Sequence, residues 1–243
     1  MIRIEPANIT VRSCNSHDDF KLCLDLQRRV WGYAEEDVVP TSIFVVAQHS
    51  GGHAYIAFDG EKAVGFALAF SADRGGERYW HSHMVGILPE YQNHGVGRML
   101  KLHQRDEAIK AGIRTIEWTF DPLELRNAYF NIGRLGAISR HYIPDCYGPS
   151  SSPVHGSLPT DRLLAVWHVA GRPQLVSTEQ IEVPVSSRIR EFKDSGDPCA
   201  FEIQTALRNR LTELFSDGYA VVGFRRDLEQ GVYILERYED RTG

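Results

Sequence analysis

The sequence predicts an α/β (α+β) fold, and three observations carry this expectation. Apolar segments between residues 53 and 88 are divided by turn residues into three strands. A short glycine-containing turn then leads into an amphipathic helix over 95–111, which Gly112 ends before the strand-like segment IRTIEWTF. After residue 172 the alternation of strand and helix patterns begins again. We therefore expect one main sheet with flanking helices and a second, smaller α/β unit.

The domain division follows from the same patterns. We expect residues 1–172 to form a core and residues 173–243 to form a small α/β appendage that packs on it. The appendage is predicted to contain a helix over about 198–217 and the strand pair YAVVGFRRD and GVYILERY. A helix and two strands provide too little hydrophobic core to be stable alone. The appendage is therefore predicted to depend on the core.

The remaining elements follow from their local signals. In chain order they are a strand at 9–13, a helix from a Ser16 or Asp18 cap to Trp31, a helix at 41–50, a short helix at 126–135, and strands at 137–143 and 163–169. The apolar run TSIFVVAQHS at 41–50 also fits a strand. We favour a helix there because Pro40 precedes the run and Gly51 follows it.

The composition excludes several classes of protein. The chain has 243 residues, with 27 lysines and arginines against 32 aspartates and glutamates, and no long basic run. This balance argues against a general nucleic-acid binder and against a protein of anionic membrane surfaces. The four cysteines lack CxxC spacing, so we expect neither a metal site nor a disulfide framework. No apolar run is long enough for a signal peptide or a membrane span, and the expected location is cytoplasmic.

The most informative segment is HMVGILPEYQNHGVGRMLKLHQRDEAIKAG, in which an apolar strand passes through a glycine-spaced turn into a helix. Gly95 and Gly97 let the backbone approach an anion, so N–H groups at the helix N-terminus can hold a pyrophosphate, with the cation Arg98 nearby. A dinucleotide fingerprint needs GxGxxG and a Walker loop needs GKS or GKT, and neither is present. A plain helix-start turn is the alternative, and the strand–turn–helix–strand order favours the anion site.

The pattern Gln92-x-x-Gly95-x-Gly97, preceded by Pro89 and a strand, resembles the acyl-CoA motif of the GNAT acyltransferase superfamily. The resemblance implies a mixed central sheet with flanking helices. It also implies an acyl-CoA co-substrate, acetyl-CoA or succinyl-CoA. The implied cofactor contacts are Ile87, Leu88, Gln92, Asn93, His94, Gly95, Val96, Gly97 and Arg98.

A second part of the resemblance lies in EWTFDPLELRNAYFNIGRLGA, which is similar to the fifth strand and following helix of these proteins. It implies that Asn127 contacts the pantetheine arm. Where the family commonly has a general-acid tyrosine, this chain has Asn131 and Ile132 before Gly136, so the identity of the acid stays open. The segments LPTDRLLAVW and GYAVVGF extend the resemblance to a subgroup with a C-terminal extension. That subgroup includes amino-acid N-acyltransferases and N-succinyltransferases.

Two histidines are the first candidates for proton transfer. In the strand WHSHMVGIL the two-residue period places His81, His83, Val85 and Ile87 on one face, leading toward the phosphate loop. Histidine titrates near neutral pH, which suits the removal of a proton from an ammonium substrate. His83 is the preferred base. The alternative is that both histidines are hydrogen-bonded in the core.

Other candidates come from the loops. Glu35, with its neighbours Glu36 and Asp37, can receive an ammonium group or act as a base, although a solvated acidic loop is the alternative. Tyr142 or Tyr147 can replace the missing acid, unless each is a buried tyrosine with a bonded hydroxyl. The arginines that can bind a substrate carboxylate are Arg126, Arg134, Arg140 and Arg162, and the sequence does not choose among them.

Two functions from different classes fit these observations. The preferred one is transfer of an acetyl or succinyl group from acyl-CoA to the amine of a small substrate, an amino acid in first place, by direct attack in a ternary complex. The alternative is a non-catalytic, CoA-binding regulatory or scaffold protein. The expected partner is a small-molecule amine rather than nucleic acid or membrane, and a homodimer is left open.

Overall fold

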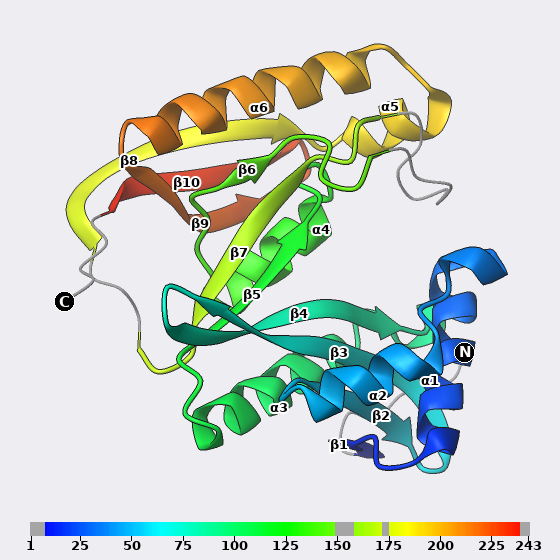
Figure 1. Ribbon diagram of the computed structural model, residues 1–243. Coiled ribbons are helices and arrows are strands. Elements are labelled where there is room, and N and C mark those ends of the chain that lie inside the picture. The colour runs from blue at the N-terminus through cyan, green and yellow to red at the C-terminus, as the bar shows by residue number, and fades with distance from the viewer. Residues whose placement is uncertain (1–7, 149–157, 172–174, 239–243) are drawn as a thin grey trace. The chain divides into compact units, whose positions relative to one another are not determined.

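The computed structural model describes residues 8–148, 158–171 and 175–238 (Figure 1). The chain divides into two compact units, Met1–Glu117 and Trp118–Gly243, and the boundary falls inside strand β5 (Thr115–Phe120). The boundary predicted near residue 172 lies at 172–174, outside the described residues, and stays a prediction.

The first unit is built on a mixed sheet with strand order β1-β2-β3-β4-β5. Its first four strands are β1 (Ile9–Ser13), β2 (His53–Asp59), β3 (Lys62–Arg74) and β4 (Glu77–Ile87). These four pair antiparallel with their neighbours, and the turn residues predicted the meander of β2, β3 and β4. Strand β5 pairs parallel with β4, because helix α3 (Val96–Lys110) forms the crossover between them. The predicted mixed sheet is confirmed.

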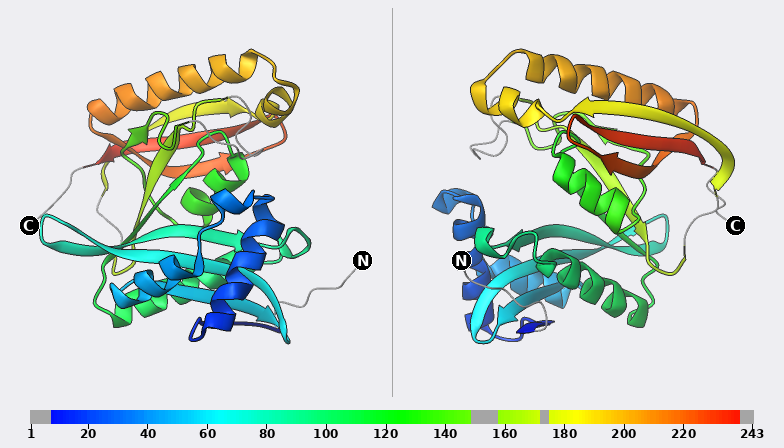
Figure 2. Two further views of the ribbon diagram at one scale, coloured as in Figure 1. Left: turned by 45° about the vertical axis from the view of Figure 1, so that its right-hand side comes forward. Right: turned by 180° about the vertical axis from the view of Figure 1, so that it is seen from behind.

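Helices cover both faces of this sheet (Figures 1 and 2). Helix α3 packs on one face, where Leu100 approaches Gly65 of β3. Helices α1 (His17–Trp31) and α2 (Thr41–His49) pack on the other face, where Trp31 and Phe44 contact the ring of Phe66. The helix predicted at 41–50 is therefore confirmed. Ser16 caps α1 by accepting a hydrogen bond from the Asp19 N–H, as its sequence signal predicted.

Strand β4 carries a bulge. Leu68 of β3 pairs with Met84 and Ala69 pairs with Ser82, so His83 is an extra residue on β4. A bulge bends its strand and redirects the side chains that follow it, and bulges are common beside active sites. This bulge overturns the prediction that Val85 and Ile87 lie on the same face of β4 as the histidines.

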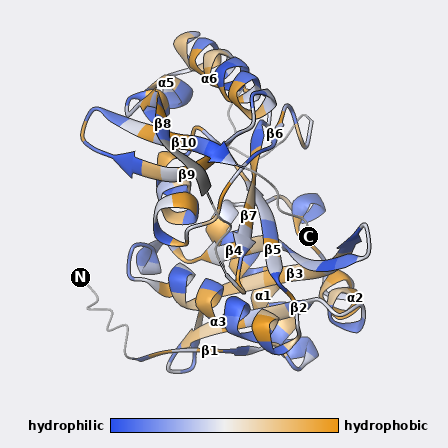
Figure 3. Cartoon of the chain, turned by 90° about the vertical axis from the view of Figure 1, so that its left-hand side faces the viewer, coloured by the Kyte–Doolittle hydropathy of each residue, from blue (hydrophilic) through white to orange (hydrophobic). Residues whose placement is uncertain are grey.

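The second unit continues from β5 into α4 (Leu125–Ala128), a π-helical turn η4 (Tyr129–Arg134), β6 (Tyr142–Ile143) and β7 (Arg162–His168). A three-stranded antiparallel sheet of order β8-β10-β9 follows, made of β8 (Leu175–Ser186), β9 (Tyr219–Arg226) and β10 (Gln230–Tyr238). Between β8 and β9 lie α5 (Ile189–Ser195) and α6 (Cys199–Ser216). Helix α6 packs against this sheet. Hydrophobic and hydrophilic residues alternate along the helix (Figure 3). None of the described helices has the length and apolar character to span a membrane.

Two predicted elements of this unit differ from the structure. The strand expected at 137–143 is regular only at Tyr142–Ile143, because Ile138 bridges to Val166 of β7 whereas Ser139 bridges to Val221 of β9. The segment thus switches partners instead of running along one strand. The helix expected at 126–135 changes to π geometry after Ala128. A Cβ at Gly133 would lie 2.9 Å from the Phe224 carbonyl oxygen, so the turn depends on close backbone contact with β9.

Candidate active site

The phosphate loop predicted from the sequence forms a sharp, exposed turn into α3. The 3₁₀ helix η3 (Pro89–Tyr91) follows β4, and Gln92 to Gly95 are exposed. Asn93 has φ of 64° and Gly95 has φ of 85°, both in the left-handed region. Open space surrounds the position that a Gly95 Cβ would occupy. This geometry turns the chain so that the next N–H groups line the start of α3.

The N-terminus of α3 is suited to bind an anion. Gly95 occupies the N-cap and has no side chain to bond the first-turn N–H groups. The unbonded N–H groups and the helix dipole both favour negative charge at this position. One turn therefore holds Asn93 to Arg98, which the sequence predicts to contact the cofactor through backbone or side chain. Val96 is buried, so it offers its backbone alone.

Contacts with the neighbouring strands hold this loop in place. Tyr91 is buried and its hydroxyl donates to Asp59 Oδ2 at 2.9 Å, at the β2–β3 hairpin. The Lys62 Nζ atom lies 4.8 Å above the Tyr91 ring. Leu88 is also buried, and its N–H bonds the Val64 carbonyl at 3.0 Å. Gln92 donates its side-chain amide to the Ile87 carbonyl at 3.1 Å. Gln92, Ile87 and Leu88 thus shape the loop.

His81 and His83 lie side by side on β4. Their ring centroids are 6.3 Å apart, and the His83 ring is 5.6 Å from that of Phe70 on β3. Burial lowers the pKa of His81, with Lys101 and Arg74 adding to the effect and Glu117 opposing it. The pKa of His83 is also lowered, by partial burial and by His81. Both rings are therefore neutral near pH 7, the state that can accept a proton.

The expectation that Val85 and Ile87 share the face of the histidines is wrong. The Ser82 hydroxyl bonds Lys101 of α3, and the Ile87 side chain lies beside Gly65, near Leu100 of α3. Ser82 and Ile87 therefore both point to the α3 face, although they lie five positions apart and strict alternation would place them on opposite faces. The extra residue at His83 causes this change, because a bulge shifts the alternation by one position.

The same region leaves part of the β4 backbone without a second strand. Within the described residues, β4 pairs with β5 at Trp80–Ile116 and His81–Glu117. From Ser82 to Ile87, β4 pairs with β3 alone. An extended ligand with amide groups can add to such an edge as a strand does. This free edge leads from the histidines to the phosphate loop.

Glu117 is a candidate that the sequence analysis missed. It pairs in register with His81, and its side chain is 6% exposed. Arg74 binds both carboxylate oxygens at 2.9 Å, and its own guanidinium lies over the Tyr79 ring. Two charge-assisted hydrogen bonds from Arg74 thus hold this carboxylate beside His81. Its position after an isoleucine in a buried strand was the available signal, since charged residues are rare there.

The structure gives Glu35 an ionic partner. Glu35 lies in the short 3₁₀ helix η2 (Glu35–Asp37) with Glu36, and it is exposed. Arg28 binds it through Nε at 2.7 Å and Nη2 at 2.8 Å. These bonds lower the pKa of Glu35 below its ordinary value. Glu35 is thus a fixed anion, better suited to hold an ammonium group than to accept a proton from it.

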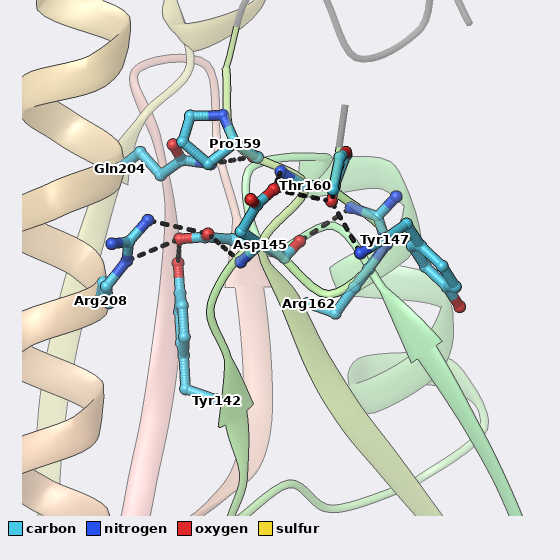
Figure 4. Close-up of polar contacts among 10 residues, drawn as sticks. Tyr142, Asp145, Tyr147, Pro159, Thr160, Arg162, Gln204 and Arg208 are labelled. Atoms are coloured by element: carbon cyan, nitrogen blue, oxygen red, sulfur yellow. Dashed lines mark hydrogen bonds and ion pairs between the residues drawn. The ribbon is translucent and has the colours of Figure 1, made fainter. Parts of the chain in front are cut away.

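Tyr142, Tyr147 and Arg162 belong to a polar cluster of the second unit (Figure 4). The Tyr142 hydroxyl donates to Asp161 Oδ2 at 2.7 Å, and burial with this bond raises the pKa of Tyr142. The Tyr147 hydroxyl lies 2.8 Å from Thr119 Oγ1. Arg162 is buried, stacks on Tyr147 and donates to the Asp161 carbonyl. Tyr142 is thus bound to a carboxylate, and a role for it as acid stays a prediction.

The asparagine-bearing helix also lies in the second unit. Asn127 is exposed on α4, whereas Asn131 and Ile132 are buried within the π turn. Tyr129, which the sequence analysis did not consider, is 39% exposed in that turn. Of the four candidate arginines, Arg126 and Arg134 are exposed, and Arg140 packs over Tyr238. The structure does not single out one of them for a carboxylate.

Comparison with known proteins identifies the fold. Residues 20–130 match the model of the Acetyltransferase (GNAT) family. No curated protein matches the chain significantly. Similar solved structures include the ribosomal-protein-S18-alanine N-acetyltransferase from Escherichia coli, with 17% identity over 70% of this chain and 99% of that chain, and a TM-score of 0.53.

Two further structures show the same likeness. The yncA protein from Salmonella typhimurium, solved with its cofactor acetyl-CoA, has 16% identity over 69% of this chain and 97% of that chain, with a TM-score of 0.56. Aminoglycoside 6'-acetyltransferase type Ii has 18% identity over 68% of this chain and 99% of that chain, with a TM-score of 0.53. The chain therefore has the mixed α/β GNAT fold, and its residues 20–130 are similar to the Acetyltransferase (GNAT) family.

Proposed function

We propose that this protein transfers an acyl group from acyl-CoA to the amine of a small substrate. One observation carries the proposal: a single strand, β4, leads from the two histidines along a free backbone edge to an uncapped helix N-terminus. The helix N-terminus suits the CoA pyrophosphate, and the edge suits the amides of the pantetheine arm. The match of residues 20–130 to the Acetyltransferase (GNAT) family supports the same chemistry.

The residues of β4 and β5 have distinct tasks in the proposed reaction. An ammonium substrate must lose a proton before its nitrogen can attack the thioester carbonyl. His83, neutral and exposed, takes this proton directly or through water, while the Glu117 carboxylate beside His81 stabilises the resulting positive charge. The thiolate that leaves needs a proton, which the sequence prediction assigns to Tyr142 or Tyr147.

The finer features of the proposal come from the sequence resemblance. An amino acid is the proposed acceptor and acetyl or succinyl the proposed acyl group. The four cysteines are free thiols, which agrees with a cytoplasmic location. A homodimer is compatible with this proposal and is not required by it.

Thiol release separates this enzyme from a non-catalytic CoA-binding protein, the alternative that the buried Ile132 keeps open. Acetyl-CoA and succinyl-CoA are each incubated with the protein and a panel of D- and L-amino acids and simple amines. Amine-dependent CoA release, with the acylated product identified by mass spectrometry, is expected for at least one pair. CoA binding in calorimetry without turnover of any pair would favour the scaffold.

The substitution Gly97→Glu is expected to abolish acyl-CoA binding. Gly97 is the second residue of α3, and its backbone is helical, so a glutamate fits the backbone without strain. A carboxylate there places negative charge where the pyrophosphate would sit, although it suits the helix dipole and keeps the fold stable. Isothermal titration of acetyl-CoA into the variant measures the loss.

Arg105→Glu is the matched control for this prediction. Arg105 lies on the same helix with a partly exposed side chain, and its substitution changes the charge by more than Gly97→Glu does. Its affinity for acetyl-CoA should stay within about twofold of native, because charge more than a turn from the helix end is screened. A folded Gly97→Glu protein with native affinity would show that this loop does not bind the cofactor.

A further inference from the structure

A group of buried polar side chains lies beneath α3, on the sheet face opposite the histidines. Lys101 is 3% exposed, and its Nζ atom donates to Ser82 Oγ at 2.8 Å and to Gln104 Oε1 at 3.2 Å. Because the Gln104 oxygen faces Lys101, its Nε2 faces His53 and donates to the ring Nε2 at 2.8 Å. A buried lysine is costly to fold, so a specific task for this amine is expected.

Ser82 links this group to the candidate active site. It is the residue between His81 and His83, and it directly precedes the extra residue of the bulge. The pairing of β4 with β5 ends at His81, so beyond that point the β3 ladder alone holds the backbone. The hydrogen bond from Lys101 to Ser82 Oγ adds a constraint from the opposite face, at the place where the strand ladder is weakest.

We propose that Lys101 is a positioning residue of the acyl-transfer site: through Ser82 it fixes the backbone of the β4 bulge and thereby the directions of the His81 and His83 rings. This inference rests on the proposed function, since the ring directions matter for a reaction in which these histidines handle a proton. The lysine itself does not contact the reacting atoms.

The electrostatic surroundings agree with this role. Burial lowers the pKa of Lys101 far below its usual value, so the amine can hold Ser82 without a full positive charge behind the histidines. Burial, Lys101 and His103 lower the pKa of His53 on β2 to about 3, so His53 stays neutral as well. The titratable groups that act on His81 are Glu117 on β5, Arg74 on β3 and Lys101 on α3, and His81 acts on His83.

Two substitutions test the link from opposite ends. Lys101→Met removes the donor at similar volume, and Ser82→Ala removes the acceptor. Each is expected to lower kcat up to about 10²-fold, as a small misplacement of catalytic groups does, while KM for acetyl-CoA stays within about twofold. The double variant should be no worse than the worse single one, because both changes break the same bond. Ser82→Thr keeps the hydroxyl and should recover most of the activity.

The pH profile distinguishes positioning from a loss of stability. Loosening the bulge exposes the histidines to water and relieves the burial that lowers the pKa values of His81 and His83, so both values rise. The acid limb of kcat/KM should therefore move to higher pH in Lys101→Met and in Ser82→Ala. Gln104→Met is the matched control, because it breaks the other Lys101 bond on the same helix and leaves Ser82 bonded. It should lower the melting temperature and leave kcat and the profile unchanged.

Two results would contradict the positioning role of Lys101. A third result would contradict the proposed acyl transfer instead. A folded Ser82→Ala protein with native kcat and profile, or a Gln104→Met protein with the same shift as Lys101→Met, contradicts the positioning role. If the wild-type protein transfers no acyl group, the proposed function fails, and the imidazole titrations of His81 and His83 by NMR decide this inference alone. Upward shifts of their midpoints in Ser82→Ala support it, and unchanged midpoints contradict it.

Discussion

Replacement of His83 by glutamine is expected to lower kcat/KM by about 10²–10⁴-fold, the range for loss of a general base. His83 lies exposed on the β4 bulge, beside His81 and Phe70, and burial of part of its ring lowers its pKa. Glutamine retains polarity and similar size but does not accept a proton near neutral pH. Acetyl-CoA affinity should change little, because the phosphate loop is not altered. Steady-state kinetics with a calorimetric CoA titration measures both quantities.

The pH profile adds a sign to this prediction. A histidine base works in its neutral form, so activity falls as the pH drops through its pKa. Because the pKa values of His81 and His83 are both lowered, the wild-type acid limb should lie below the ordinary histidine value of about 6.5. His81→Gln, on the same face of β4, is the matched control and should cost less. A His83→Gln enzyme with near-native kcat and an unaltered acid limb would refute this role and direct attention to Glu35, Glu36 or Glu117.

Replacement of Asp161 by asparagine is expected to destabilise the second unit by about 3–5 kcal/mol, the cost of breaking a buried ion pair from one side. The Asp161 side chain has no exposed surface, and Arg208 of α6 binds both of its oxygens, at 2.8 and 2.9 Å (Figure 4). Tyr142 and the Asp145 N–H donate to the same carboxylate. In all four bonds the Asp161 oxygens accept, so the NH₂ group of an asparagine would point at hydrogen-bond donors and leave them without an acceptor. Chemical denaturation followed by circular dichroism measures the loss.

An exposed pair with the same fork geometry serves as the control. Arg188 binds both oxygens of Glu191 at 3.0 Å, but both side chains are more than 60% exposed, at 63% and 62%. Glu191→Gln should therefore change stability far less than Asp161→Asn does, because water screens an exposed ion pair. Should Asp161→Asn not fold, Tyr142→Phe removes one of the four bonds and should cost about 1 kcal/mol. Equal losses for Asp161→Asn and Glu191→Gln would show that burial of this pair does not govern its contribution.

Local signals in the sequence predicted most of the first unit. The Ser16 cap, the turn between β2 and β3, and the Gly95 turn before α3 each act within a few residues, so their geometry can be inferred without the rest of the fold. The turn between β4 and α3 was predictable for the same reason, whereas its role in binding a phosphate stays a prediction. Its glycine follows a strand and precedes a helix, and this order depends on neighbouring residues alone.

The features that the sequence did not reveal depend on contacts between distant residues. The bulge at His83 arises from the register of β3 against β4, so the two-residue period placed Val85 and Ile87 on the wrong face. The π turn after Ala128 depends on the close approach of Gly133 to the Phe224 backbone, about ninety residues further along the chain. Glu117 and Lys101 became candidates only when their partners, Arg74 and Ser82, were seen beside them.

The anchoring of the phosphate loop by Tyr91 and Asp59 has a thermodynamic consequence. Under the proposed function, a loop that this bond holds in one shape loses little conformational entropy on cofactor binding, so less of the interaction energy is spent on ordering the chain. Association is then limited by diffusion and orientation rather than by a prior rearrangement. The heat capacity change on binding should reflect the surface that the ligand itself covers, with no contribution from folding of the loop.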